Sequence, residues 1–163
     1  MSKKTKVTVV GSGYVGMSLA VLLSQFNDVV VLDIDVERVN LINNGQSPIV
    51  DSEIESFFIN YELNLSATLD KHQAYNNADF IVVATPTNYS SNTNSFDTES
   101  VDSVVCDALE LNKDALVIIK STIPIGHTKS LQEKHRTSRV IFSPEFLREG
   151  MALMDSLYPS RII

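Results

Sequence analysis

The 163-residue sequence has a single cysteine, few basic residues and no long apolar run. One cysteine, Cys106, excludes a disulfide framework and a metal site built from several cysteines, and it suits a reducing cytosol. The 13 Lys and Arg residues against 20 Asp and Glu give a net charge of −7, without a basic surface for nucleic acid. No stretch approaches the roughly 20 apolar residues of a membrane span. We therefore expect a cytoplasmic protein with no nucleic-acid or membrane partner.

The chain is also short for an enzyme that has separate cofactor and substrate domains, because a domain typically takes about 100–200 residues. Hydrophobic residues make up 44% of the sequence, which is enough to form a core. The basic N-terminus is followed by a run of only four residues, Val7–Val10, before Gly11, so it is not a signal peptide. The length predicts one domain.

Short apolar runs alternate with amphipathic stretches along the whole chain. Six runs are expected to form strands, at residues 6–10, 29–32, 66–69, 80–84, 115–119 and 140–142. Helices are expected near residues 15–26, 36–43, 52–61, 70–77, 101–108 and 128–136. The third of these helices would open with a capping box at Ser52–Glu55. Residues 85–96 are expected to form a loop. Alternation of this kind predicts an α/β fold: a Rossmann-like, doubly wound, mainly parallel six-stranded sheet with helices on both faces.

Residues 11–16 fit the pattern G-x-G-x-x-G, directly after the first expected strand and at the start of a helix. Gly11 permits the tight turn, Gly13 lets the backbone approach a pyrophosphate, and Gly16 allows close packing of helix on strand. The helix N-terminus then supplies free N–H groups and a partial positive charge, so that even an acidic chain can bind a diphosphate. The motif predicts dinucleotide binding, with a glycine turn that holds no ligand as the alternative.

An acidic residue follows the second strand at the place that the dinucleotide hypothesis requires. Asp33 lies 22 residues after Gly11, where a carboxylate accepts hydrogen bonds from the adenosine ribose hydroxyls. Because that carboxylate repels a 2′-phosphate, NAD is favoured over NADP. Asp35 is expected to cap the next helix. Arg38 either contacts the ribose or adenine edge or is a solvated charge on that helix.

Polar residues also follow the three later strands, at residues 84–87, 120–126 and 143–150. Ligands of open α/β sheets bind beyond the carboxyl ends of the strands, so these residues predict a reaction site. Ordinary loop polarity is the alternative. Glu145 and Glu149 are four residues apart and would share a face, beside Arg148, if their segment is helical.

The segments at residues 11–16, 84–87, 121–126 and 143–149 together closely resemble the N-terminal region of the bacterial UDP-glucose 6-dehydrogenases, in the UDP-glucose/GDP-mannose dehydrogenase family. The resemblance covers essentially all 163 residues. This family oxidises the C6 alcohol of UDP-glucose to a carboxylate with two NAD and one water, through an aldehyde and a cysteine thioester. The resemblance implies NAD as the cofactor, UDP-glucose as the partner of the full-length enzyme, and a homodimer of that enzyme.

The resemblance also implies roles for individual residues. Tyr14 and Val15 join the three glycines as cofactor contacts, and Thr87, Thr122 and Glu149 contact the cofactor on its nicotinamide side. Thr122 also helps to hold the water, and Glu145 acts in thioester hydrolysis as a general base or water organiser. The sugar-nucleotide site would be lined by Glu145, Phe146, Leu147, Arg148 and Glu149.

One part of the family pattern has no match in these residues. The family's nucleophile lies in a G-x-C-x-P-K-D segment of the C-terminal half, whereas Cys106 lies in an expected helix and is interpreted as a small structural residue. We therefore expect residues 1–163 to be an NAD-binding domain, truncated near its C-terminal end and inactive alone, without the central helix and the C-terminal UDP-binding domain. Residues 158–163 resemble the start of a further strand.

Two alternatives stay open. The chain is the NAD-binding part of a UDP-N-acetylhexosamine or GDP-mannose dehydrogenase, or it is a stand-alone dinucleotide-binding sensor. No metal ligand set is expected in either case.

Overall fold

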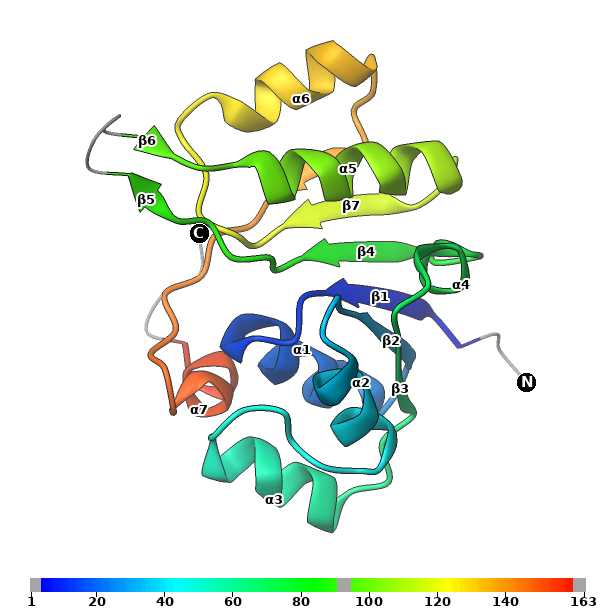
Figure 1. Cartoon of the computed structure of the whole chain (residues 1–163), viewed down its shortest axis with the longest axis vertical. Helices are drawn as coiled ribbons and strands as arrows, with labels where there is room; N and C mark the ends of the chain where they lie inside the picture. Colours follow the sequence, from blue (N-terminus) through cyan, green and yellow to red (C-terminus); the bar gives the residue numbers. More distant parts are fainter. Residues whose placement is uncertain (1–3, 91–94, 160–163) are drawn as a thin grey trace.

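The structure, a computed structural model, describes residues 4–90 and 95–159 (Figure 1). Its strands are β1 (Lys6–Val10), β2 (Asp28–Leu32), β3 (Leu65–Thr68), β4 (Phe80–Val83), β5 (Tyr89–Ser90), β6 (Ser95–Phe96), β7 (Leu116–Ile119) and β8 (Val140–Phe142). Its helices are α1 (Tyr14–Ser24), α2 (Val36–Asn43), α3 (Ser52–Asn60), α4 (Lys71–Tyr75), α5 (Glu99–Leu111), α6 (His127–His135) and α7 (Ala152–Leu157).

Six of the strands form one sheet in the order β3-β2-β1-β4-β7-β8, and every neighbouring pair is parallel. This confirms the predicted doubly wound sheet. Because all six strands run the same way, their carboxyl ends meet at one edge, on the left of Figure 1. The strand order reverses between β1 and β4, and such a switch point is where open α/β sheets bind ligands.

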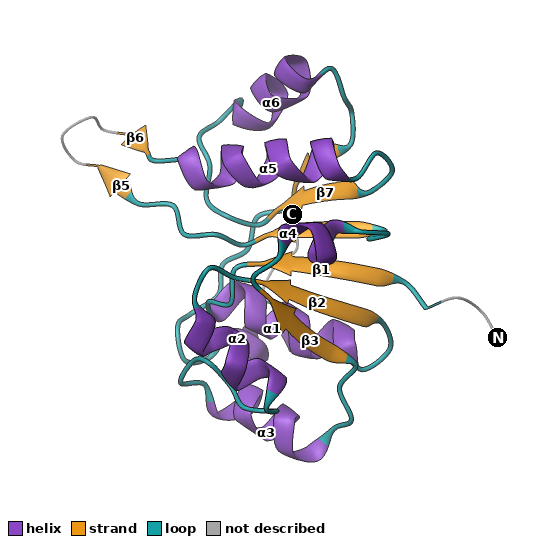
Figure 2. Ribbon diagram, turned by 45° about the vertical axis from the view of Figure 1, so that its right-hand side comes forward, coloured by secondary structure: helices purple, strands orange, loops and turns teal. Residues whose placement is uncertain are grey.

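Helices cover both faces of the sheet, as Figure 2 shows, and a separate apolar core fills each face. One core joins the sheet to α1, α2, α3 and α7, and its fully buried members include Met17, Ile54 and Leu153. The other joins the sheet to α4, α5 and α6 through residues such as Tyr75 and Val105. Burial on both faces explains why the strands are almost continuously apolar rather than alternating. Among the described residues, no helix is long and apolar enough to cross a membrane.

Aspartate side chains cap the N-termini of three consecutive helices. Asp35 caps α2, as expected, and Asp70 caps α4. The expected capping box at Ser52–Glu55 is wrong by one residue: Ser52 is already helical, and the N-cap of α3 is Asp51, whose carboxylate accepts from Glu53 N and Ile54 N. A carboxylate is favoured there because it also meets the positive end of the helix dipole.

Three further expectations need correction. Phe26 is not part of the apolar helix face, because α1 ends at Ser24 and the Phe26 side chain is 76% exposed. Residues 85–96 are not wholly loop, since β5 and β6 pair as a short antiparallel hairpin. Glu145 and Glu149 do not share a helix face: residues 143–148 are irregular, and the helix α7 begins only at Ala152. The expected strand at residues 158–163 lies largely outside the described residues, and Tyr158 is the C-cap of α7.

Candidate functional site

Two of the three glycines after β1 are required by the protein's own packing. Gly11 has φ +98°, and a Cβ there would lie 2.6 Å from the carbonyl oxygen of Ala84, at the end of β4. A Cβ on Gly16 would lie 1.9 Å from the carbonyl oxygen of Gly11. These contacts bring the first turn of α1 directly against the end of β1, at the switch point of the sheet.

Gly13 differs, because no described atom beyond its two chain neighbours lies within 4 Å of the position that its Cβ would take, and its φ of −79° suits any residue. The space beside Gly13 is therefore open. Gly13 is also the N-cap of α1, which receives no side-chain cap and has no acidic residue in its first turn. The next three helices all have aspartate caps, so α1 alone among these four presents uncapped N–H groups to open space. Such a helix N-terminus is suited to an anion.

Asp33, at the end of β2, is bound to the glycine turn. Its Oδ2 accepts hydrogen bonds from Ser12 N at 2.7 Å and Ser12 Oγ at 2.5 Å, and its Oδ1 accepts from Asp35 N at 3.0 Å. Partial burial alone would raise the pKa of Asp33, but the hydrogen bonds from Ser12 and from the backbone outweigh it, and the pKa lies below its usual value. The group is therefore a carboxylate at neutral pH. Two oxygens can accept about four hydrogen bonds, so Oδ1 retains capacity for a ligand hydroxyl.

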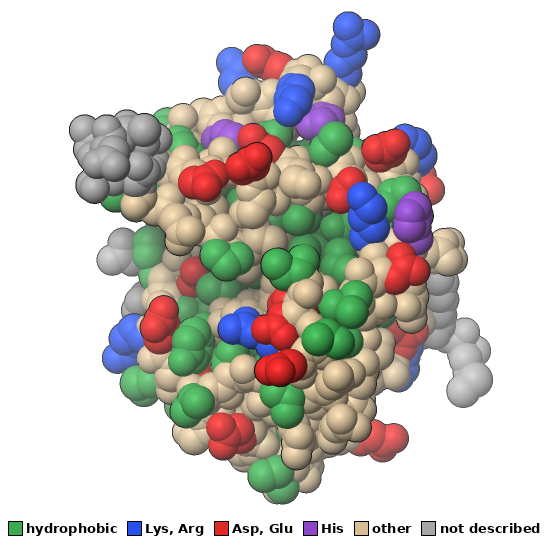
Figure 3. Space-filling view, viewed as in Figure 1, with side chains coloured by type: hydrophobic (Ala, Val, Ile, Leu, Met, Phe, Trp, Pro, Cys, Tyr) green, Lys and Arg blue, Asp and Glu red, His purple; other side chains and the backbone are tan. Residues whose placement is uncertain are grey.

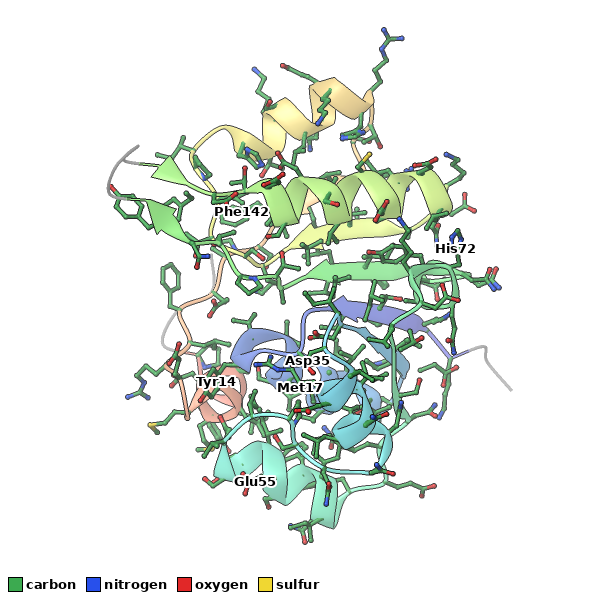
Figure 4. All side chains as sticks on the ribbon, viewed as in Figure 1. Tyr14, Met17, Asp35, Glu55, His72 and Phe142 are labelled. Atoms are coloured by element: carbon green, nitrogen blue, oxygen red, sulfur yellow. The ribbon has the colours of Figure 1, made fainter. Side chains whose placement is uncertain are left out.

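Arg38 extends from α2 over the glycine turn. Its Nη1 lies 3.4 Å from the carbonyl oxygen of Ser12, and its Nε lies 3.6 Å from Asp35 Oδ2. Figure 4 shows Tyr14, in the first turn of α1, and Asp35, at the start of α2, on the side of the molecule where the strands end. The first-half residues predicted to bind a cofactor thus lie around one turn.

The polar residues of the second half lie at the ends of β4 and β7, which are adjacent strands. Ser121 Oγ donates to the carbonyl oxygen of Thr85 at 2.7 Å and so ties the two strand ends together. Thr87 is partly buried, whereas the Thr122 side chain is exposed. Both threonines therefore lie on the same edge of the sheet as the glycine turn.

Lys120 lies at this edge, within residues 120–126, although the sequence predicts no individual role for it. Its Nζ lies 3.3 Å from Ser143 Oγ and 3.5 Å from the carbonyl oxygen of Pro144, so it connects the loops after β7 and β8. Burial lowers the pKa of Lys120, and the negative charge of Glu145 partly opposes that effect. The signal that could have found it is a lysine placed directly at the end of a buried apolar strand.

Residues 143–151, which we call the crossing segment, run from β8 along the carboxyl edge of the sheet to α7, beside α1 (Figure 1). Within it, Glu145 Oε2 accepts from Leu147 N at 2.6 Å. Phe146 and Glu149 have exposed side chains. The segment thus carries the predicted substrate residues across the edge where the glycine turn lies.

Two contacts hold the crossing segment at its far end. Arg148 does not pair with either glutamate: its Nη2 lies 2.7 Å from Asp155 Oδ1, and hydrogen bonds from the Arg148 side chain and backbone hold the pKa of Asp155 at about 2. Asp51, which is 1% exposed, accepts from Ala152 N at 3.1 Å through Oδ2. One buried carboxylate therefore caps both α3 and α7.

The expected structural role of Cys106 needs correction, because the side chain is exposed on α5 rather than packed in the core. It also lies towards the amino end of the sheet, in a groove with Arg139, just before β8. Cys106 is therefore at the opposite end of the sheet from the glycine turn. Among the residues described here, no group of three or more His, Cys, Asp or Glu side chains could hold a metal ion.

A six-stranded parallel sheet with a glycine turn at its switch point and a carboxylate after β2 defines a dinucleotide-binding domain of the Rossmann class. Residues 5–163 match the model of the UDP-glucose/GDP-mannose dehydrogenase family, NAD binding domain. The chain belongs to this family, and the match covers almost the whole of it.

Individual relatives agree with the family. The chain is 51% identical over 158 residues to UDP-glucose 6-dehydrogenase of Streptococcus pneumoniae, and 52% identical over 160 residues to that of Campylobacter jejuni. Each alignment covers 97% of this chain but only 40% and 41% of the relative, so the chain spans about two fifths of their length. A solved structure of a UDP-glucose dehydrogenase from Pyrobaculum islandicum superposes with a TM-score of 0.83 at 28% identity, covering 99% of this chain and 40% of that one.

Proposed function

We propose that the edge around Gly13 and Asp33 holds NAD, and that the chain is the NAD-binding part of a UDP-glucose 6-dehydrogenase. NAD binding at this edge is supported mainly by one observation: the N-terminus of α1 has no side-chain cap and lies beside open space at Gly13. Backbone N–H groups of Tyr14 and Val15 would donate to the pyrophosphate, and Oδ1 of Asp33 would accept from an adenosine ribose hydroxyl. The residues present thus fit the cofactor that the family requires.

Selectivity for NAD over NADP follows from Asp33. Its carboxylate is fixed by Ser12 and is charged at neutral pH, so a 2′-phosphate placed beside it would meet a negative charge rather than a hydrogen-bond donor. Arg38 does not offset this repulsion fully, because it is shared with Asp35 and with the glycine turn.

The proposal that the enzyme is a UDP-glucose 6-dehydrogenase is supported by two such enzymes, which are 51% and 52% identical to this chain over 97% of its length. Solved structures of GDP-mannose and N-acetylhexosamine dehydrogenases are only 21–24% identical to this chain, so they support the shared fold but not a shared substrate. A stand-alone sensor gives no use for the polar residues after β7 and β8. UDP-glucose is therefore the substrate class that we propose for the whole enzyme.

We further propose roles for the residues that follow strands β4, β7 and β8. NAD bound at this edge supplies a hydride acceptor. Thr87 and Glu149 would contact its nicotinamide side, Thr122 would orient the water, and Glu145 would act on that water as a base. Residues 145–149 would line the substrate, although the Arg148 guanidinium is already paired with Asp155. Because the single cysteine lies at the other end of the sheet, the nucleophile would come from outside these 163 residues.

Two measurements test the proposal separately. Isothermal titration calorimetry should detect NAD binding to the chain, and Asp33→Ala should weaken NAD while leaving NADP equal or tighter. Unchanged selectivity would refute the role of Asp33, and no NAD binding by the folded chain would refute the site. A spectrophotometric assay with UDP-glucose and NAD should give no NADH from the chain alone. Turnover by the purified chain would refute the external nucleophile.

A further inference from the structure

A second groove lies at the amino end of the sheet, away from the proposed NAD site. It has a volume of about 460 Å³ and lies between the C-terminal ends of α5 and α6. Its lining includes Cys106, Glu110, Lys113, His135, Arg136 and Arg139, and we call it the basic groove. Figure 3 shows basic and histidine side chains around these helix ends, at the upper right.

The charge of the groove is opposite to that of the chain. Three cations and one carboxylate line it, whereas the whole sequence has a net charge of −7. Lysines and arginines commonly neutralise carbonyl groups at helix C-termini. That explains part of this set: Lys113 Nζ donates to Leu109 O at 3.3 Å, and Arg139 Nη1 donates to Ala115 O at 2.8 Å.

Arg136, the C-cap of α6, is favoured by the same kind of helix end, but its side chain makes no such carbonyl contact among the described residues. Its guanidinium makes no hydrogen bond or ion pair with the residues that the structure describes, although its backbone N–H caps α6. The residue also takes a left-handed conformation, with φ +50°, which glycine or asparagine would adopt more easily. Arg136 therefore occupies a position where the backbone favours a different residue. Its side chain is exposed, and its five donors have no partner among the described residues.

His135 gives an independent indication of a ligand. Its Nε2 is buried and has no hydrogen-bond partner among the residues described. Such atoms are rare in folded proteins, and an ion or water bound at the site is one of the explanations for them. His135 is among the residues that line the groove, beside Arg136.

We propose that the basic groove binds a small anion that carries a phosphate group, at a second site separate from the NAD site. The planar guanidinium groups of Arg136 and Arg139 suit phosphate oxygens, and Lys113 adds a point charge. His135 Nε2 donates in the tautomer that carries its proton there. The volume fits a small ligand rather than an extended polymer. This inference does not depend on the proposed function, because it uses none of the residues of that site.

Cys106 makes the proposal directly testable, because it is the only cysteine, is exposed and lines the groove. We would measure its alkylation by iodoacetamide at fixed pH and ionic strength, with inorganic pyrophosphate as the probe. Pyrophosphate in the groove should slow the reaction several-fold and saturably, below about 10 mM. Pyrophosphate held at α1 would not affect this thiol. The His135 ring resonances should shift in parallel, while those of His72, on α4, should not.

Matched variants separate a site from general charge effects. Arg136→Gly suits the left-handed backbone, so it should keep the fold while weakening protection by about tenfold or more. Lys134→Ala removes the same charge from the same helix but not from the groove lining, and should retain protection. Glu110→Gln should strengthen it. Absence of saturable protection, or equal protection in the Arg136→Gly and Lys134→Ala variants, would overturn the proposal.

Discussion

Replacing Gly13 by serine should separate binding from stability, because the fold does not itself need a glycine there. The position has open space, and its φ of −79° and ψ of −170° are allowed for serine. Serine is a preferred N-cap, and its hydroxyl would accept from the N–H groups of the first turn of α1. An N-cap side chain bonds the second or third N–H of the helix, and the second, Val15 N, is one of the two donors that we assign to the NAD pyrophosphate.

The size of each effect follows from this geometry. A serine cap adds a few tenths of a kcal/mol relative to glycine, and the loss of glycine restricts the unfolded chain, so the free energy of unfolding should rise by about 0.5–1 kcal/mol. For a chain of this length, that is about 2 °C in Tm. Binding should lose one charge-assisted hydrogen bond, at about 1.5–3 kcal/mol, which corresponds to about a 10- to 150-fold increase in the Kd for NAD.

Calorimetric titration with NAD and thermal unfolding of the same sample measure both quantities. Gly16→Ala provides the contrast, since its Cβ would lie 1.9 Å from the Gly11 carbonyl oxygen, a backbone atom that cannot turn aside as a flexible side chain could. That variant should lose about 3 kcal/mol or more of stability. If Gly13→Ser bound NAD as tightly as the parent chain, the uncapped helix end would not be the pyrophosphate site. If it were as unstable as Gly16→Ala, the reading of the open space would be wrong.

Two other predictions concern carboxylates. Asp51→Ala removes the cap shared by α3 and α7 and leaves Ala152 N buried without an acceptor. Urea unfolding should therefore show a loss of about 2–4 kcal/mol in the free energy of unfolding, against about 1 kcal/mol for Asp70→Ala, because Asp70 caps α4 alone. Equal losses in the two variants would contradict the double role of Asp51. The folded pKa of Asp33 is below its unfolded value of about 3.9, so its contribution to stability is present above that pH and lost as pH falls through the folded pKa. Asp33→Asn should therefore flatten the loss of stability that sets in as the pH falls below about 4, and a variant with the parent's pH profile would refute the assignment.

Much of the fold could be predicted because its signals are local. Each central strand is an apolar run of four or five residues, such as Val7–Val10, and the glycine pattern directly after it marks the start of α1. Parallel pairing follows from alternation with helices, and it brings all the strand ends to one edge. The order of the motifs along the chain then identified the family.

What could not be predicted depends on contacts between distant residues. Asp51 reads as an ordinary helix cap, and its bond to Ala152, 101 residues later, has no local signal. The irregular course of residues 143–148 between β8 and α7 likewise has no local signal, since the spacing of Glu145 and Glu149 is compatible with a helix. Lys120 and the basic groove likewise depend on side chains from separate elements, such as Arg136 and Lys113, that meet only in the folded chain.

The central claim is that NAD binds with its pyrophosphate at the first turn of α1. Amide chemical shifts in a 1H–15N NMR titration with NAD test it most directly, because every backbone N–H reports its own surroundings. The largest changes should occur at Gly13, Tyr14, Val15 and Gly16, with smaller ones near Asp33. Largest changes elsewhere, or none in this turn at saturating NAD, would contradict the account.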